Sequence, residues 1–445
     1  MTTSTSPLLY IETYGCQMNV NDSEVVASVM REQGYATCNA AEDADLVLVN
    51  TCSVRENAEL RVWRRLAELR TLKRKNPRLM LGVIGCMAER LKEKLLEQEQ
   101  SVDLVVGPDA YRDLPHLVSL ARAGQKGVNV ELSREETYAE IAPVRYASNG
   151  VAAFVSIMRG CNNACSYCVV PYTRGAERSR SAQSILREVQ TLADNGYKEV
   201  TLLGQNVNSY RTYADDGKTV ACSFAQLLEE VSQLSPQMRI RFSTSHPKDM
   251  SNDVLHVMAK RSNICRSIHL PAQSGSNRML ALMNRSYTRE EYLDRIAAIR
   301  TILPGCSIST DLIAGFCSET DDDHRQTLSL MREVGFDFAF MFMYSERPNT
   351  KAARRYRDDV PEEVKTRRLN EIIALQGELS LKSKQPYVGK PVEVLAEGFS
   401  KKSKEQLFGR TSQNMVVVFP RGSHNAGDCL TVTPTRCTSA TLVVE

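Results

Sequence analysis

Short apolar runs separated by helical patterns recur along most of this 445-residue chain. In residues 8–122 the runs LLYIET, DLVLVN, LMLGVIG and DLVVG are typical of buried parallel strands, and helical patterns at 53–74 and 87–98 lie between them. Strands that alternate with helices predict crossover units. We therefore expect an N-terminal doubly wound parallel sheet over 8–122, followed by a polar connection.

The alternation resumes with longer units between residues 151 and 345. Six strand patterns, from AFVSIMR to DFAFMFMY, alternate with helical patterns such as 182–195 and 320–334. Six consecutive βα units predict a partial TIM-like (βα)6 barrel. A long amphipathic helix with Pro361 in its first turn closes this central domain, which we assign to residues 147–379.

The hydrophobic period changes to two beyond Gln385. Runs such as PVEVLAEGF and NMVVVFP predict β-strands, and Gly and Ser-Lys turns separate them. We assign residues 380–445 to a small C-terminal β-barrel. The fold class is therefore α/β, with a third, all-β part.

Composition excludes several classes of protein. An apolar fraction of 42% and a charged fraction of 24% are ordinary for a globular protein. The segment MTTSTSPLLY has no basic region followed by an apolar run, so it does not resemble a signal peptide. No window approaches the roughly 18 apolar residues that a membrane span needs. We expect a cytoplasmic protein that does not bind a membrane.

Thirteen cysteines need an explanation, because disulfides are rare in the cytosol and the number is odd. An isolated cysteine is usually a small core residue. That interpretation fits the seven that lack ligand spacing, Cys38, Cys222, Cys265, Cys306, Cys317, Cys429 and Cys437. The remaining six form two groups of three.

The first group is Cys161-x3-Cys165-x2-Cys168, directly after a predicted strand. A loop at the carboxyl end of a barrel strand lies on the face where barrel active sites are built. Structural zinc usually takes four protein ligands, and no fourth Cys or His lies nearby. Three thiolates on a cubane leave one iron open, so the spacing favours an iron–sulfur cluster, with zinc as the alternative.

The second group, Cys16, Cys52 and Cys86, is spread over 70 residues but has a common context. Each cysteine follows the end of a predicted strand. The carboxyl ends of neighbouring parallel strands share one edge of a sheet, where open α/β sheets bind ligands. The pattern favours a second metal site over three unrelated core thiols.

The central motif resembles the signature of the radical S-adenosylmethionine (SAM) superfamily. The resemblance implies a 4Fe-4S cluster on the three central cysteines, SAM on the open iron, and Tyr167 as the common aromatic between the last two ligands. Other strand ends are expected to complete the SAM site, although each such residue also fits turn chemistry or rim polarity. These candidates are Gly204, Gln205, Asn206, His269, Gln273, Ser274, Asp311 and Gly315.

The segments YIETYGCQMNV, VLVNTCSVRENAE and GVIGCMAER resemble the three blocks of the methylthiotransferase N-terminal domain. In that family the three cysteines hold an auxiliary 4Fe-4S cluster. The segment GRTSQNMVVVF resembles the TRAM domain, a small RNA-binding barrel, and the central block is most similar to the MiaB branch. The resemblance implies methylthiolation of N6-isopentenyladenosine next to the tRNA anticodon. No catalytic side chain is assigned beyond the cluster ligands.

Other functions stay open at this point. Threonylcarbamoyl-adenosine in tRNA and a ribosomal-protein aspartate are the alternative substrates, and an iron–sulfur protein without catalysis is the alternative class. The implied partners are a tRNA anticodon stem-loop, a low-potential electron donor and a sulfur donor. The oligomeric state is left open, with a monomer as the default expectation.

Local charge suggests where RNA would bind, although the net charge is only +3. Residues 55–75 contain eight Arg or Lys against three Glu on a helical pattern, which also fits a solvated helix face. The other candidate phosphate contacts are Arg174, Arg178, Lys401, Lys402, Lys404 and Arg410.

Overall fold

The computed structural model describes residues 6–53, 56–146 and 148–445, with the side chains of 56–58 left out. Residues 1–5 of the N-terminal segment and Arg55 of the basic segment lie outside this description. The chain divides into two compact units. The first comprises Met1–Ser148, Phe154–Asn163 and Val169–Ile185, and the second comprises Asn149–Ala153, Ala164–Cys168 and Leu186–Glu445.

The first unit is built on a parallel sheet with the strand order β2-β1-β3-β4-β5-β6. The central strands β3 and β4 are buried along their whole length, as the uninterrupted apolar runs predict. The outermost strands β2 and β6 were not predicted, because each has only two or three residues. The strands are β1 (Leu8–Tyr14), β2 (Ala36–Thr37), β3 (Leu46–Thr51), β4 (Met80–Gly85), β5 (Leu104–Val106) and β6 (Gly127–Asn129).

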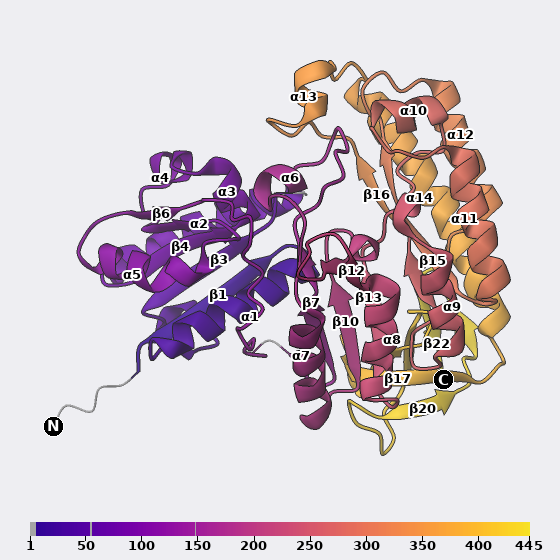
Figure 1. Ribbon diagram of the computed structural model, residues 1–445, viewed down its shortest axis with the longest axis horizontal. Coiled ribbons are helices and arrows are strands. Elements are labelled where there is room, and N and C mark those ends of the chain that lie inside the picture. Colours follow the sequence, from indigo (N-terminus) through magenta and orange to yellow (C-terminus); the bar gives the residue numbers. More distant parts are fainter. Residues whose placement is uncertain (1–5, 54–55, 147) are drawn as a thin grey trace. The chain divides into compact units, whose positions relative to one another are not determined.

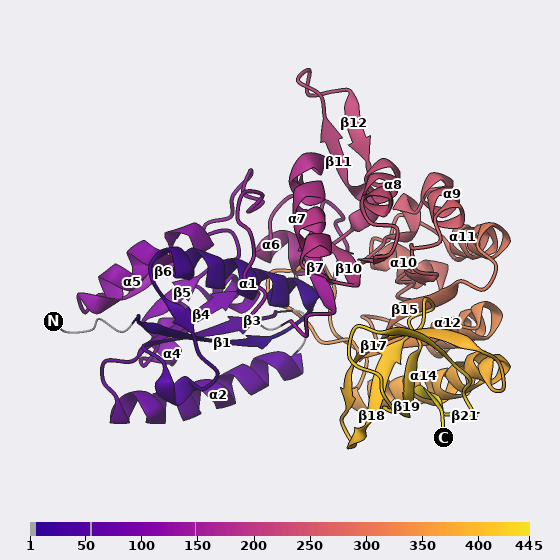
Figure 2. The same cartoon turned by 90° about the horizontal axis from the view of Figure 1, so that it is seen from below.

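Helices cover both faces of this sheet (Figure 2). Helices α1 (Gln17–Glu32) and α5 (Leu114–Arg122) pack on one face around a core that includes Leu48. Helices α2 (Glu56–Lys75), α3 (Cys86–Leu91) and α4 (Lys94–Gln98) lie with the other core, around Val49. Two cores on opposite faces confirm the doubly wound sheet. The predicted helix 87–98 is two helices, broken at Lys92, which has a φ of 53°.

The parallel strands of the partial barrel lie in the second unit, except that β7 is divided between the two units after Ala153 (Figure 1). They form two sheets, β13-β10-β7 and β14-β15-β16, which a parallel bridge between Ile240 and Ile264 connects. This succession of six strands, each followed by a helix, confirms the (βα)6 prediction. The strands are β7 (Ala152–Ser156), β10 (Glu199–Leu203), β13 (Arg239–Ser243), β14 (Ser267–His269), β15 (Ser307–Ala314) and β16 (Phe338–Met343).

Local sequence fixes where the barrel helices begin. Ser223, Thr288 and Thr320 each form a capping box at the start of a helix, so these hydroxyls accept from backbone N–H groups that would otherwise lack a partner. Pro361 is the residue that precedes α14 rather than part of its first turn. The helices are α7 (Ala182–Asp194), α8 (Phe224–Leu234), α9 (Asn252–Lys260), α10 (Asn277–Leu282), α11 (Arg289–Ile302), α12 (Asp321–Val334), α13 (Lys351–Arg355) and α14 (Glu362–Lys384).

The C-terminal strands form a curled sheet with the order β20-β17-β18-β19-β22-β21. Its core is apolar and includes Val394, Val417 and Phe419. The strands are β17 (Val392–Ser400), β18 (Ser403–Arg410), β19 (Val416–Pro420), β20 (Cys429–Val432), β21 (Arg436–Cys437) and β22 (Thr441–Val443). The predicted small β-barrel is confirmed in this form.

The turn after β18 lies under the amino-terminal ends of the barrel strands. Arg241 donates to the carbonyl oxygens of Thr411 and Ser412, at 2.8 and 3.2 Å, and the hydroxyl of Ser307 donates to the carbonyl of Gln413 at 2.7 Å. Backbone carbonyls therefore accept from several polar groups at this end of the barrel, where Arg241 is also ion-paired with Glu199 at 2.9 Å. A hairpin of β11 (Arg211–Tyr213) and β12 (Val220–Ser223) between β10 and α8 was not predicted.

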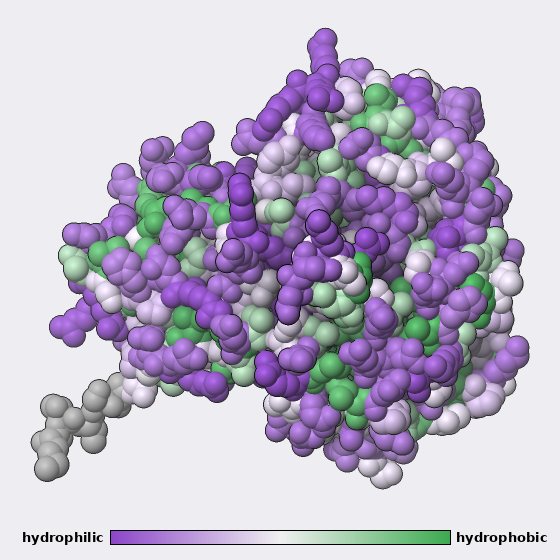
Figure 3. Space-filling model, viewed as in Figure 1, coloured by the Kyte–Doolittle hydropathy of each residue, from purple (hydrophilic) through white to green (hydrophobic). Residues whose placement is uncertain are grey.

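Apolar residues on the face in Figure 3 form small patches among hydrophilic ones, which is usual for a folded protein surface. Among the residues that the structure describes, no helix is both long and apolar enough to cross a bilayer.

Candidate active site

The first unit brings Cys16, Cys52 and Cys86 to one edge of its sheet. Strands β1, β3 and β4 are neighbours, and their last residues, Tyr14, Thr51 and Gly85, are in register. Cys52 and Cys86 follow directly after β3 and β4, and Cys16 lies two residues past the end of β1. The three cysteines therefore occupy adjacent carboxyl strand ends, with Cys52 and Cys86 buried and Cys16 exposed.

Close backbone approach makes this edge compact. A Cβ added at Gly15 would lie 3.0 Å from the Cβ of Cys52, and one added at Gly85 would lie 2.7 Å from the carbonyl oxygen of Thr51. Gly85 also has a φ of 92°, which favours glycine. Larger residues at either position would push the cysteine turns apart.

Asn19 connects the first cysteine turn to the neighbouring strand. Its side-chain oxygen accepts from the backbone N–H of Cys16 at 3.2 Å. Its amide nitrogen donates to Asn50 Oδ1 at 3.0 Å and to the Thr51 carbonyl at 3.1 Å. Asn19 is fully buried, so its hydrogen bonds fix the turn that carries Cys16.

The donor chemistry of this edge fits an iron–sulfur cluster. Among the described residues, no three Cys, His, Asp or Glu side chains are close enough to bind one metal ion. Cysteines on different irons of a cubane stand farther apart than the ligands of a single ion, so three strand-end thiols suit a cluster.

A buried network of charges lies beneath the same edge. Asp22 of α1 accepts from Arg159 at 2.8 Å and from Arg174 at 2.7 Å. Asp109 accepts from Arg178 at 3.0 Å and lies 3.5 Å from Arg159. Burial alone would raise the pKa of Asp22, but the two guanidinium charges and their hydrogen bonds outweigh burial and lower that pKa. All five side chains are at least nine-tenths buried.

The positions of Arg174 and Arg178 argue against the phosphate contacts that the sequence suggested for them. Their exposed fractions are 3% and 7%, and both guanidinium groups are paired with carboxylates inside the first unit. Basic residues beside a cysteine loop indicate a positively charged segment, but the sequence does not show whether their side chains are buried. We do not include these two arginines in the proposed RNA surface.

Arg174 instead faces one of the strand-end cysteines. Helix α6 (Val170–Thr173), which it follows, packs against α3, and α3 begins at Cys86. Burial raises the pKa of the Cys86 thiol, and the Arg174 charge opposes that rise. Nη1 of Arg174 is buried and makes no hydrogen bond of ordinary geometry with a described residue. One guanidinium nitrogen is thus available beside a candidate cluster ligand.

Glu89, one turn after Cys86 in α3, is a buried acid with an incomplete set of partners. Its exposed fraction is 2%, its nearest cation is Lys92 at 3.8 Å, and its Oε2 has no hydrogen-bond donor among the described residues. Burial is the main reason that the pKa of Glu89 rises to about 7.

The loop of the central cysteines is anchored at both of its ends. In the first unit, the N–H of Cys161 donates to the carbonyl of Gly175 at 3.2 Å. In the second unit, the N–H of Cys168 donates to the carbonyl of Cys165 at 3.2 Å, which forms a tight turn. Ser166 within that turn donates to the carbonyls of Met283 and Leu282, at 2.9 and 2.8 Å.

Arg285 contacts this turn, and the sequence analysis missed it. Its Nη1 donates to Cys165 Sγ at 3.2 Å, and its exposed fraction is 4%. No spacing rule relates two residues that are 120 positions apart. The only sequence signal is an arginine in the segment MNRSYT, shortly after a predicted barrel helix.

Polar atoms without partners gather at the carboxyl ends of β10 and β13. The side-chain oxygens of Gln205, Asn206 and Asn208, which follow β10, and the hydroxyl of Ser245, which follows β13, are buried and make no hydrogen bond with a described residue. The amide orientation of Asn206 is fixed, because its nitrogen donates to Asp249 at 2.7 Å. Buried acceptors of this kind need a donor, so they fit the ammonium and hydroxyl groups of a ligand.

His246 lies beside these atoms and is neutral. Burial lowers its pKa to about 2, and the charges of Arg285 and Lys248 act in the same direction. The ring accepts from the N–H of Lys248 at 3.4 Å and packs edge-on against Tyr287. Sequence reasoning selected Gln205 and Asn206 but missed Asn208, Ser245 and His246, although the segments GQNVN and STSH both follow strong strand patterns.

His269 and Asp311 also lie together, on the open face of β14 and β15. His269 Nε2 is 3.4 Å from Asp311 Oδ1, and its Nδ1 is 3.0 Å from the hydroxyl of Ser309. Tyr167 packs edge-on against Phe316 in a small apolar cluster. Direct contact of these side chains with a cofactor stays a prediction.

Four other candidates have structural roles in the barrel. Gly204 donates its N–H to the carbonyl of Ser243 at 3.1 Å. Gln273 donates its N–H to the carbonyl of Asp311 at 2.8 Å, and the hydroxyl of Ser274 is 3.3 Å from that of Thr327. A Cβ added at Gly315 would lie 2.3 Å from Lys365 Cγ, so glycine is needed there for packing.

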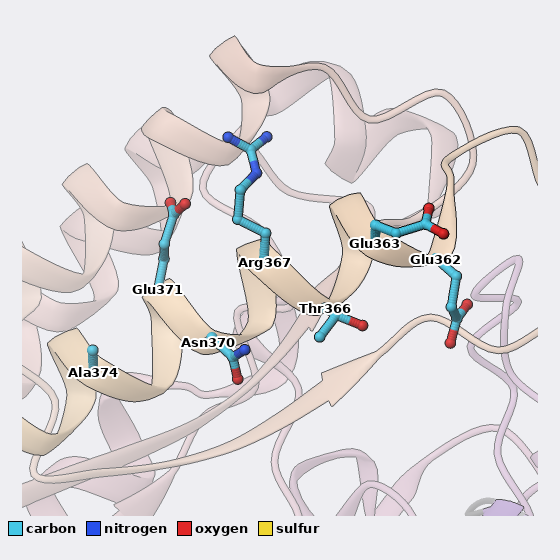
Figure 4. Close-up of a pocket in the computed structure, with 7 residues that line it drawn as sticks. All are labelled: Glu362, Glu363, Thr366, Arg367, Asn370, Glu371 and Ala374. Carbon is cyan, nitrogen blue, oxygen red and sulfur yellow. The ribbon is translucent and has the colours of Figure 1, made fainter.

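The open groove in Figure 4 runs along α14 and is separate from these sites. It has a volume of about 730 Å³ and its lining includes three glutamates but no cysteine. Three glutamates against one arginine do not suit a phosphate group. The residues are Glu362, Glu363, Thr366, Arg367, Asn370, Glu371 and Ala374.

The remaining basic candidates differ in exposure. Lys401, Lys402 and Lys404 are exposed at and just after the turn between β17 and β18. Arg410 is ion-paired with Glu397 at 2.5 Å. In α2 the ion pairs of Arg65, Arg70 and Lys73 stay within the first unit, whereas Arg61, Arg64, Arg74 and Lys75 are exposed. The solvated-face interpretation therefore holds for part of this helix.

Comparison with known proteins assigns the three parts of the chain. Residues 8–107 match the model of the Uncharacterized protein family UPF0004, residues 155–331 match the Radical SAM superfamily, and residues 385–442 match the TRAM domain. Among solved structures, the radical S-adenosylmethionine methyltransferase TsrM from Kitasatospora setae has the same fold. It aligns with a TM-score of 0.57 at 14% identity, over 78% of this chain and 77% of that one.

The Radical SAM match and the barrel that carries the central cysteines define the chain as a radical SAM enzyme. A curated relative from Phocaeicola vulgatus is 58% identical over 100% of this chain and 97% of its own length. Another, from Chloroherpeton thalassium, is 55% identical over 98% and 95%. Both are named tRNA-2-methylthio-N(6)-dimethylallyladenosine synthase. The chain belongs to this family, the MiaB branch of the methylthiotransferases.

Neutralising Asp22 is expected to destabilise the first unit. In D22N, Arg159 and Arg174 lose their shared carboxylate in a buried site, at a cost of about 3–5 kcal/mol. The single tryptophan, Trp63, lies in α2, so its fluorescence during denaturation reports on this unit. The control E68Q removes an exposed pair with Arg65 and should cost less than about 1 kcal/mol. Equal effects would contradict a structural role for the network.

Replacing Glu89 with glutamine should stabilise the first unit increasingly as the pH rises from about 4.5 to 7 and above. Because the folded-state pKa is raised from 4.5 to about 7, wild-type stability is fully present below about pH 4.5 and declines as the pH rises to about 7. E89Q has no such loss, so it should gain about 2 kcal/mol at pH 8 and little at pH 5. Trp63 fluorescence measures this difference, with exposed E97Q as the control. A gain that is independent of pH would contradict the burial of a titrating Glu89.

Proposed function

We propose that this protein methylthiolates isopentenyladenosine next to the tRNA anticodon and thereby forms 2-methylthio-N6-isopentenyladenosine. The observation that carries the proposal is the presence of two cysteine triads in a chain whose whole length matches curated relatives with that activity in their name. The reaction attacks an unactivated C–H bond. Such a carbon offers neither an acidic proton nor a leaving group, so acid–base chemistry cannot begin the reaction.

Two 4Fe-4S clusters fit the two triads. Cys161, Cys165 and Cys168 would hold the radical SAM cluster, and Cys16, Cys52 and Cys86 would hold an auxiliary cluster at the sheet edge. When bound, a reduced 4Fe-4S cluster supplies the electron that cleaves SAM and gives the radical that removes a substrate hydrogen. The polypeptide contributes ligands, orientation and burial. Thiolate ligands must stay reduced and disulfides are rare in a reducing compartment, so we propose the cytoplasm as the location.

The residues after β10 and β13 would bind SAM. Gln205, Asn206, Asn208 and Ser245 offer buried acceptors to the ammonium and ribose hydroxyl groups. Neutral His246 adds no positive charge beside the sulfonium at physiological pH. Rigid acceptors in a site that excludes water orient a bound cofactor without a cost of rearrangement.

The C-terminal part would bind the anticodon stem-loop. Its match to the TRAM domain and the exposed lysines Lys401, Lys402 and Lys404 support this assignment. An unpaired base next to the anticodon can leave its stack and enter a pocket, which suits modification in a loop. We assign residues 8–122 to the auxiliary cluster, 147–379 to the radical SAM core and 380–445 to RNA binding. A low-potential electron donor and a sulfur donor complete the partners.

Substitution of each triad separates the two cluster roles. The triple variant C161A/C165A/C168A should form no 5′-deoxyadenosine after anaerobic reconstitution with dithionite and SAM. The variant C16A/C52A/C86A should still cleave SAM without coupling but make no methylthio product. The control C38A/C429A/C437A should retain both activities. Methylthio product from the second variant would contradict an auxiliary cluster on these cysteines.

Mass spectrometry of tRNA nucleosides from a strain without this gene distinguishes the substrates. We expect the 2-methylthio-isopentenyl nucleoside to disappear and the unmethylthiolated isopentenyladenosine to accumulate. Loss of a methylthio threonylcarbamoyl nucleoside, or of a methylthio-aspartate on a ribosomal protein, would assign the protein to another branch.

Removal of the TRAM lysines should weaken RNA binding in a salt-dependent way. In K401A/K402A/K404A, affinity for an anticodon stem-loop should fall, and the slope of log K against log salt should decrease by about 2, because three phosphate contacts no longer release counterions. The control K382A alters an exposed lysine of α14 and should change neither quantity. An unchanged slope would contradict phosphate contacts by these three lysines.

A further inference from the structure

Arg285 is a buried guanidinium whose three nitrogens each have a separate partner. Nε donates to the hydroxyl of Tyr287 at 3.0 Å, and Nη2 donates to the carbonyl of Pro271 at 3.0 Å. Nη1 donates to Cys165 Sγ at 3.2 Å. The Tyr287 hydroxyl in turn donates to the carbonyl of Ala272 at 2.9 Å. The planar group is therefore held in one orientation, with one edge against the sulfur.

The backbone around Arg285 fixes this contact further. The carbonyl of Met283 accepts from the N–H of Ser166, and the side-chain amide of Asn284 donates to the carbonyl of Ala164 at 2.7 Å. The segment before Arg285 is thus hydrogen-bonded to the residues on both sides of Cys165. The backbone that carries Arg285 is therefore held beside the turn that carries Cys165.

We propose that Arg285 is a positioning residue that orients Cys165 and raises the reduction potential of the radical SAM cluster through a charged hydrogen bond to the ligand sulfur. This inference rests on the proposed function only in that Cys161, Cys165 and Cys168 hold the cluster. It assigns to the chain a control of how readily that cluster accepts an electron.

The direction of the effect follows from charge. Reduction adds one negative charge to the cluster, and part of it lies on the ligand sulfurs. A buried cation 3.2 Å from one sulfur stabilises the reduced form more than the oxidised form. Hydrogen bonds to cluster sulfurs and local net charge are known to set such potentials. Loss of the cation therefore makes the cluster harder to reduce.

The test measures the midpoint potential by redox titration with electron paramagnetic resonance. The background is C16A/C52A/C86A, so that one cluster gives the signal. In that background we compare R285Q, which removes the charge, with R285K, which keeps it, and with Y287F, which removes the partner of Nε. R295Q, on the exposed face of α11, is the control. Iron content is measured for each protein.

We expect R285Q to keep its iron and to have a more negative potential, with a smaller shift in R285K and none in R295Q. An unchanged potential in R285Q at full iron content overturns the proposal. If R285Q and R285K both lose the cluster, Y287F decides: a shift to a more negative potential supports the role of Arg285, and no shift overturns it. Failure of the parent protein to bind a cluster would instead refute the proposed function.

Discussion

The buried pairing of Asp22 with Arg159 and Arg174 is the interaction on which the first unit depends. Asp22 lies in α1, Arg159 in the short strand β8 (Met158–Arg159), and Arg174 after α6. One carboxylate therefore connects a helix of the doubly wound sheet with the chain on both sides of the central cysteine loop. Desolvation of such charges is costly, and the pairing offsets it only while both partners are present.

The network also explains why the N-terminal sheet forms one compact unit with residues 154–163 and 169–185. Asp109, at the carboxyl end of β5, binds Arg178, and Arg178 donates back to the carbonyl of Arg174 at 3.1 Å. Three guanidinium groups share two carboxylates, so the site has an excess of positive charge. The positive charge of Arg174 acts on the Cys86 thiol and opposes the rise of its pKa. A thiolate-ligated cluster at the sheet edge would balance the excess positive charge, which links metal binding to the stability of this unit.

Sequence reasoning located the cysteines because their positions follow from strand ends alone. A buried strand in a parallel sheet has a fixed direction, so the residue after it must lie at the carboxyl edge. The common location of Cys16, Cys52 and Cys86 could be predicted from the ends of β1, β3 and β4 alone. The same reasoning found Gln205 and Asn206 after β10. Sequence reasoning predicted the wrong environment for Arg174 and Arg178, because a basic residue in a loop is usually exposed to solvent. Only the tertiary structure shows that buried carboxylates pair with these two arginines.

Arg285 illustrates a second limit of sequence reasoning. Its partner Cys165 is 120 residues away, and neither periodicity nor spacing relates them. The contact exists because the segment after α10 folds back on the cysteine turn through backbone hydrogen bonds, which a single sequence does not encode in any recognisable pattern. The break at Lys92 is similar, since its positive φ follows from packing around α3 and α4 rather than from a glycine.

The polar groups at the two ends of the barrel have different partners, and those at the carboxyl end support the proposed SAM site independently of the cysteines. At the amino-terminal end, Arg239 and Arg241 donate to backbone carbonyls of residues 410–412. At the carboxyl-terminal end, the side-chain oxygens of Gln205, Asn206 and Asn208 are buried and have no donor in the part of the chain that the structure describes. A folded protein rarely tolerates several unsatisfied acceptors in one place, because each costs about 1–3 kcal/mol. Such a cost is expected where a ligand completes the hydrogen bonds, as we propose for SAM after β10 and β13.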